Sequence, residues 1–272
     1  SMKKLIYLTI CVFLIYTNIF CVELNTSFIE NKGQLINNLG EVENEILFYT
    51  SDETHNFFIK KNLISVVSNG IYPAVQTSNN TEIAKYRFDI EFLNTNKELQ
   101  VIKDGTNYEK YNFYYDKIAV TDVSSYNKIL ISDLYKNIDA VYYYNKNNLK
   151  YDLIVRAGAS ISDIKFQIMG SINEHISENG DLIIETPLGN FIKPKPFVYQ
   201  YDNYGNKIEI QANYEFTKGA IVYNISENYD TSKDLIIDPE IGLVSYCGGN
   251  GQDALYSIKQ DNNGDYYISG ES

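Results

Sequence analysis

The sequence predicts an all-β protein: a β-sandwich-like domain followed by the start of a β-propeller-type repeat. Almost every periodic segment alternates apolar and polar residues or is a short apolar run, and both patterns are typical of strands. Turn residues separate these segments at intervals of about 8–12 residues, as in sandwiches and barrels. Outside the N-terminal apolar run, no window combines the apolar spacing and the capping residues of an amphipathic helix.

The clearest strand is Tyr86–Leu93, where aromatic and aliphatic residues alternate with Arg87, Asp89 and Glu91. Ala140–Tyr144 and Leu149–Val155 flank an Asn-rich turn and predict a hairpin. The β-branched content of Ile129–Ile138 favours a strand over a helical turn. The other predicted strands are Ile46–Thr50, Asn56–Lys60, Leu63–Val67, Tyr111–Tyr115, Ile164–Met169, Asp181–Thr186, Phe197–Tyr201, Lys207–Thr217, Ala220–Ile225 and Leu235–Ile237.

The chain divides into three parts. Residues 1–21 are expected to be a signal peptide, because Lys3 and Lys4 precede the apolar run Leu5–Phe20. Residues 22–240 form the β-rich N-terminal domain, and the number of strands leaves open two packed subdomains divided near Asn69–Glu82. Residues 241–272 form a single partial repeat. The protein is therefore expected to be exported, either secreted or at the cell surface, with membrane attachment only if Cys21 is lipidated.

Charge and cysteine content narrow the function classes. The net charge is −12, and it becomes −14 without residues 1–21, which carry two lysines and no acids. So acidic a chain is not expected to bind nucleic acid. Cys11 and Cys21 lie in the export segment, which leaves Cys247 without an internal disulfide partner. Stability must therefore come from the hydrophobic core.

Several motifs occur in a fixed order along the chain. They are Phe28–Gln34 (FIENKGQ), Asp133–Asp139 (DLYKNID) followed by Val141–Tyr144, Leu149–Ala159, Leu235–Pro239 (LIIDP) and Ser245–Gly249 (SYCGG). Together they resemble the N-terminal region that precedes SBBP-type β-propeller repeats in bacterial secreted and surface proteins. Lys136-Asn137 stand where Pro-Gly is usual, and Arg156-Ala157 replace the usual Pro before Gly158. The resemblance implies an exported, non-catalytic module that leads into a propeller, and it implies no ligand.

Two segments near the C-terminus resemble calcium loops. Gly248–Tyr256 fits the nonapeptide GGxGxDxUx, in which Asp253 would supply a carboxylate. A β-roll needs consecutive copies of this nonapeptide, and the chain holds one, so a propeller repeat explains the same residues better. Asp261–Asp265 lacks the later glutamate of a D-x-[DN]-x-D-G loop and fits a hairpin turn. The sequence therefore assigns no metal-binding residue and no cofactor.

No catalytic residue is assigned either. His55 and His175 are the only histidines, and neither belongs to an HExxH motif. No GxSxG elbow supports a serine nucleophile, and Cys247 is better explained as a small buried residue. With 35 acidic residues, carboxylate pairs carry no specificity for glycoside hydrolysis.

The prediction is a non-enzymatic extracellular or cell-surface module for structure or recognition, which precedes a β-propeller. Its partner would be a protein or glycan at the cell surface. The run Tyr142–Tyr144 alternates faces, so at least one of these phenols is expected to point outward. Two alternatives stay open: a carbohydrate-active hydrolase, which needs two convergent acids in a cleft, and a calcium-dependent ligand-binding module.

Overall fold

A computed structural model describes residues 27–37, 39–52, 55–71, 83–115, 118–145, 148–226, 228–239, 254–260 and 266–271. The predicted signal peptide, Cys247 and both calcium-like turns lie outside these residues. Within them, the structure consists of strands and one 3₁₀ turn, Ile161–Asp163, which confirms the all-β prediction. No helix in the described part of the chain is long and apolar enough to cross a membrane.

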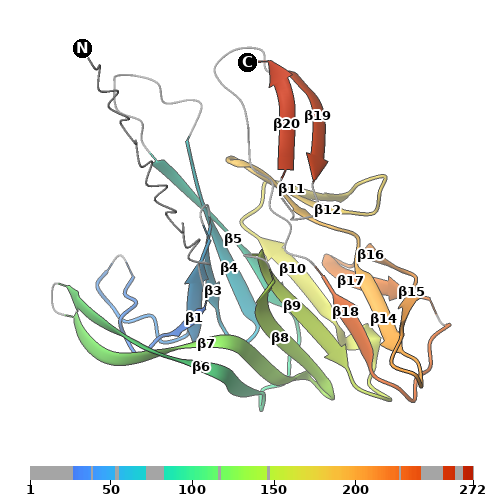
Figure 1. Cartoon of the computed structure of the whole chain (residues 1–272), viewed down its shortest axis with the longest axis horizontal. Helices are drawn as coiled ribbons and strands as arrows, with labels where there is room; N and C mark the ends of the chain where they lie inside the picture. The colour runs from blue at the N-terminus through green and yellow to red at the C-terminus, as the bar shows by residue number, and fades with distance from the viewer. Residues whose placement is uncertain are drawn as a thin grey trace, which may run out of the picture.

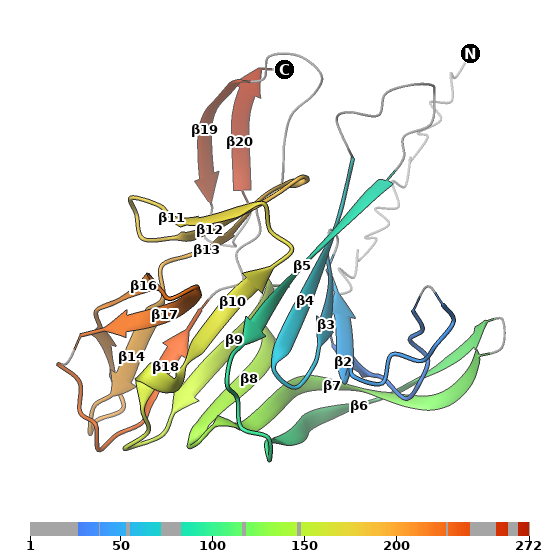
Figure 2. The ribbon, with the colours of Figure 1, turned by 180° about the vertical axis from the view of Figure 1, so that it is seen from behind.

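One large antiparallel sheet dominates the molecule (Figures 1 and 2). Its strand order is β15-β14-β18-β9-β8-β7-β1-β2-β3-β4-β5-β10-β17-β16, and β6 pairs with β7 outside this path. The strands are β1 (Phe28–Glu30), β2 (Phe48–Ser51), β3 (His55–Ile59), β4 (Leu63–Ile71), β5 (Ile83–Phe92), β6 (Gln100–Tyr115), β7 (Ile118–Tyr135), β8 (Ile138–Asn145), β9 (Asn148–Val155), β10 (Lys165–Met169), β14 (Phe197–Tyr201), β15 (Lys207–Ile210), β16 (Ala212–Thr217), β17 (Ala220–Ile225) and β18 (Leu235–Asp238).

The sheet nearly closes on itself. Strands β15 and β16 stand at opposite ends of the strand order, yet only Gln211 separates them in the chain. One segment therefore pairs with β14 through its first half and with β17 through its second half.

Alternation of side chains builds the core on one face of this sheet. In β5, Phe88, Ile90 and Phe92 are buried, whereas Arg87 lies on the opposite face and is exposed. The buried apolar residues form one cluster that draws on strands from β1 to β18. Burying aliphatic and aromatic side chains stabilises a fold by roughly 1.5–3 kcal/mol each, so this cluster is a major source of stability.

The described residues also form two smaller sheets. Strands β11 (Asn173–Ile176), β12 (Leu182–Thr186) and β13 (Gly189–Lys193) form a three-stranded sheet, which lies across one end of the large sheet in Figures 1 and 2. Its inner face adds Leu182, Ile184 and Phe191 to the core. Strands β19 (Ala254–Gln260) and β20 (Tyr266–Glu271) pair as an antiparallel hairpin, as the sequence predicted around Asp261–Asp265.

The strands that flank the possible division near Asn69–Glu82 lie in one sheet. Residues 69–71 pair with residues 83–85 as the end of the β4–β5 ladder, and both strands belong to the large sheet. The predicted hairpin of β8 and β9 is confirmed, because Asn145 pairs with Asn148. Residues 129–135 are strand, as favoured, but they end a much longer strand, β7, whose partner β6 was predicted only over its last five residues.

Candidate recognition surface

Five aromatic side chains gather on the face of the large sheet opposite the core. We call Tyr49, Phe58, Tyr111, Phe113 and Tyr115 the aromatic surface. Tyr49 of β2 pairs with Phe58 of β3, and their rings stack with centroids 6.5 Å apart and planes 29° apart. They point outward because the alternate residues of both strands, including Phe48 and Phe57, fill the core.

The other three aromatic side chains belong to the long β6–β7 hairpin, which extends from the body of the sheet (Figure 1). The rings of Tyr111 and Phe113 lie 6.4 Å apart with planes at 19°, and Tyr115 is 40% exposed. Lys32 Nζ donates a hydrogen bond of 2.7 Å to the carbonyl oxygen of Asp122, which ties this hairpin to the loop after β1.

The phenol of Tyr49 interacts electrostatically with those of Tyr115 and Tyr111. Burial raises the pKa of Tyr49 above its ordinary value, and the nearby phenols of Tyr115 and Tyr111 raise it further, against a hydrogen bond with Gln34 that lowers it. Half-buried phenols that stay neutral offer flat apolar faces together with hydroxyl groups. Such side chains are well suited to recognition, because they combine large contact area with low conformational entropy.

A pair of acids lies elsewhere, on the outer face of β9 and β18. Ile237 pairs with Leu153, so the next residue, Asp238, lies beside Asp152. Tyr143 Oη donates to Asp152 Oδ1 at 3.0 Å, and Lys150 Nζ lies 3.7 Å from Asp238 Oδ1. Burial, and then the charge of Asp238, raise the pKa of Asp152 to about 6. Two acids therefore converge, as the hydrolase alternative requires.

A cleft among the described residues lies away from this acid pair. A cleft of about 550 Å³ is lined by Asn94, Asn96, Tyr135, Lys136, Asp163 and Lys165. It holds a single carboxylate, that of Asp163, and neither Asp152 nor Asp238 lines it. In this cleft the hydroxyl of Tyr135 donates a hydrogen bond of 2.9 Å to the carbonyl oxygen of Lys165.

The two histidines lie in different environments, one buried and one half-exposed. His55 is buried, its Nδ1 is 3.4 Å from Asp52 Oδ1, and its ring packs against Phe57 and Phe191. His175 is half-exposed beside Glu185, at 3.2 Å. The i,i+3 spacing of Asp52 and His55 was the sequence signal for the first contact, and our sequence analysis missed it. Across the described residues, no group of three or more His, Cys, Asp and Glu side chains is arranged to hold a metal ion.

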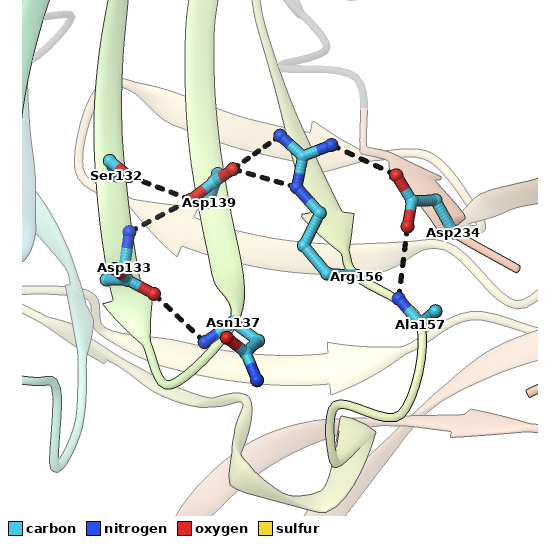
Figure 3. Close-up of polar contacts among 7 residues, drawn as sticks. All are labelled: Ser132, Asp133, Asn137, Asp139, Arg156, Ala157 and Asp234. Carbon is cyan, nitrogen blue, oxygen red and sulfur yellow. Dashed lines mark hydrogen bonds and ion pairs between the residues drawn. The ribbon is translucent and has the colours of Figure 1, made fainter. Parts of the chain in front are cut away.

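Figure 3 shows an ionic network at the ends of β7, β8 and β9, which the sequence did not predict. Arg156 donates to Asp139 through Nε (3.1 Å) and Nη2 (2.7 Å), and to Asp234 through Nη1 (3.0 Å). Asp139 is buried and also accepts from Ser132 Oγ and the Asp133 amide. The hydrogen bond to Asp139 raises the pKa of Arg156. Asp133 and Asp139 belong to the DLYKNID motif, which therefore has a structural role, and Asp234 directly precedes LIIDP.

The tyrosine run divides between the two faces of β8. Tyr142 is fully buried in the core, and Tyr143 points outward to Asp152. Tyr144 packs against Phe28 and shares a hydrogen bond of 2.9 Å with Thr50. Of these three tyrosines, Tyr143 alone points away from the core, as the alternation predicted, and its hydroxyl donates a hydrogen bond to Asp152.

Comparison with known proteins identifies the family of this chain. Residues 28–240 match the model of a domain of unknown function, DUF7948. No curated protein and no solved structure matches the chain. Because the matching region covers well over half of the sequence and nearly all of the large sheet, the protein belongs to the DUF7948 family.

Proposed function

We propose that this protein is a non-enzymatic recognition module, exported to the cell surface or beyond it, that binds a glycan through the aromatic surface. The observation that carries the proposal is the grouping of two near-parallel ring pairs, Tyr49–Phe58 and Tyr111–Phe113, on one outer face. These four rings are partly exposed on the outer face and Tyr115 beside them is 40% exposed, and a group of aromatic side chains left partly open to solvent favours an interaction site. Sugar rings present apolar C–H faces to such platforms, whereas their hydroxyls pair with phenols and water.

The same proposal includes the architecture that the sequence implies. The large sheet, folded on itself around one core, would act as a sandwich-like domain that presents a propeller. The β19–β20 hairpin supports this proposal, because a propeller blade is a four-stranded antiparallel sheet and one such hairpin would supply two of its strands. Export and the signal peptide remain part of the proposal, on the strength of Lys3, Lys4 and the apolar run that follows.

The test is binding of the purified protein to an array of neutral and acidic polysaccharides, together with proteins of a cell-surface fraction. We expect binding to a glycan that weakens at least tenfold in the double variant Tyr111→Ala/Phe113→Ala. The matched control is Tyr204→Ala/Phe216→Ala, which removes two exposed aromatic rings from other loops and strands. Binding that survives in the first variant, or capture of proteins alone, would contradict the proposal.

The hydrolase alternative keeps one supporting observation, the acid pair Asp152 and Asp238. It predicts release of reducing sugars from a bound polysaccharide, and loss of that release in Asp152→Asn. The calcium alternative stays a prediction as well: calcium would raise the melting temperature of the wild-type protein but not of Asp253→Ala.

A further inference from the structure

Lys193, the last residue of β13, is completely buried. It pairs in register with Leu182 of β12 and lies on the inner face of the small sheet, next to the core residues Leu182 and Phe191. Lysine is almost never buried without a charged partner, because an ammonium loses most of its hydration there. Its place therefore needs a physical explanation.

Among the described residues, the group in contact with the amine of Lys193 is a phenol. Its Nζ donates to Tyr151 Oη at 3.1 Å and lies 4.9 Å from the centre of that ring. Burial raises the pKa of Tyr151 well above its ordinary value, and the neighbouring phenols of Tyr223, Tyr142 and Tyr135 raise it further. Among the described residues, no ion pair forms with Lys193, and burial alone lowers its pKa to about 7.

Two further phenols close this part of the core. Tyr214 of β16 and Tyr223 of β17 pack with ring centroids 5.6 Å apart. The buried hydroxyl of Tyr214 has no hydrogen-bond partner within the described protein, whereas the hydroxyl of Tyr223 interacts with that of Tyr151. Burial raises the pKa of Tyr214, and the negative charge of Asp181, in the turn between β11 and β12, raises it further. His55 of β3 also faces β13, and its ring lies 6.1 Å from that of Phe191.

We propose that the sheet β11–β13 is a pH-responsive cap, which docks on the core while Lys193 is uncharged and opens more readily once Lys193 can gain a proton. The single contact of its amine with Tyr151 suits a neutral amine, because a phenol does not compensate an ammonium for its lost hydration. Opening the cap returns Lys193 to water, where it holds a proton up to about pH 10. Docking is therefore linked to proton release.

The sign of the effect follows from the lowered pKa. The contribution of Lys193 to docking is fully present above the ordinary lysine pKa of 10.5, declines as the pH falls, and declines no further below about 7, where the docked state is also protonated. Within that window the opening equilibrium rises about tenfold for each pH unit lost. Above about pH 10, ionisation of the released tyrosines would favour opening again, so the useful range is pH 7–9.5.

Hydrogen exchange over pH 7–9.5, corrected for the intrinsic exchange rate, tests the cap directly. We expect protection of the β12 and β13 amides to fall about tenfold per pH unit as the pH decreases, whereas β7–β9 keep theirs. In Lys193→Met this dependence should vanish, and in the matched control Lys195→Met, an exposed lysine two residues later, it should persist. It should persist in His55→Gln too. Equal loss of protection in β7–β9 would overturn the cap.

A second measurement needs no variant. The rate at which an amine-acylating reagent modifies Lys195 should rise about tenfold per pH unit, because only the neutral amine reacts. For Lys193 the rate should be nearly constant between pH 7.5 and 9.5, since opening and deprotonation change in opposite directions. A rate that rises in parallel with that of Lys195 would show that Lys193 stays charged in the docked state and would refute the proposal.

Discussion

Replacing Arg156 with alanine removes the one cation that joins the end of β9 to the β7–β8 turn and to the segment before β18. Three hydrogen bonds to carboxylates are lost, and Asp139 keeps two donors: Ser132 Oγ at 3.3 Å and the Asp133 amide at 2.9 Å. The network thus changes from a compensated ion pair to an isolated buried charge.

The expected cost can be bounded from burial. Removing one partner of a buried ion pair costs about 3–5 kcal/mol, but the Arg156 side chain is 47% exposed, so water replaces part of what is lost. The bond to Asp234, a carboxylate 42% exposed, should contribute little. We therefore expect Arg156→Ala to lower the free energy of unfolding by about 2–3 kcal/mol. In a domain of this size that corresponds to a fall in melting temperature of about 4–12 °C.

Urea unfolding followed by far-ultraviolet circular dichroism measures this change, since the chain has no tryptophan. The matched control is Arg87→Ala, the other arginine, whose two bonds of 2.7 Å reach Asp89 within the same strand and join no separate segments. It should cost less than about 1 kcal/mol. In an Asp139→Asn background, Arg156→Ala should also cost less than in the wild type. Equal costs for the two arginines, or a change below about 0.5 kcal/mol for Arg156→Ala, would refute the reasoning.

Two further predictions concern pH and backbone. Because the pKa of Asp152 is raised from 3.8 to about 6, the folded protein binds this proton more tightly than the unfolded chain, and the free energy of unfolding should fall as the pH rises from about 4 to 6. Asp152→Asn should flatten that decline in denaturant titrations at pH 4–7; an unchanged slope would exclude Asp152 as its source. Gly170 has φ +87°, and an added Cβ would lie 2.9 Å from the Arg87 carbonyl oxygen. Gly170→Ala should therefore lose more stability than Gly205→Ala, by about 1–3 kcal/mol, since Gly205 has a similar φ of +84° and open space around it. Similar melting temperatures for the two variants would contradict this.

The alternation of apolar and polar residues predicted well those strands that bury one of their two faces. The alternation in Tyr86–Leu93 and the turn between Ala140–Tyr144 and Leu149–Val155 each fix a face or a register within a few residues. Pairing between distant segments leaves no such mark. Nothing in Phe28–Glu30 indicates that this short strand lies between β2 and β7.

The side-chain clusters were harder still to predict. Arg156 is 17 residues from Asp139 and 78 from Asp234, and only the fold brings these three together. Lysine is ordinarily read as a surface residue, so Lys193 drew no attention. Its spacing of two from Phe191 was a usable signal, because alternate residues of a strand share a face.

The strand β6 has a consequence for the behaviour of the protein in concentrated solution. It pairs with β7 along one side only, which leaves the other side as a long border of the large sheet where a second molecule could add a strand. Irregularities between Thr106 and Lys110 and between Tyr111 and Phe113 interrupt the ladder, and Lys103 and Lys110 place cations along it. Bulges and lysines of this kind obstruct edge-to-edge aggregation, so the hairpin can display aromatic rings without templating fibrils.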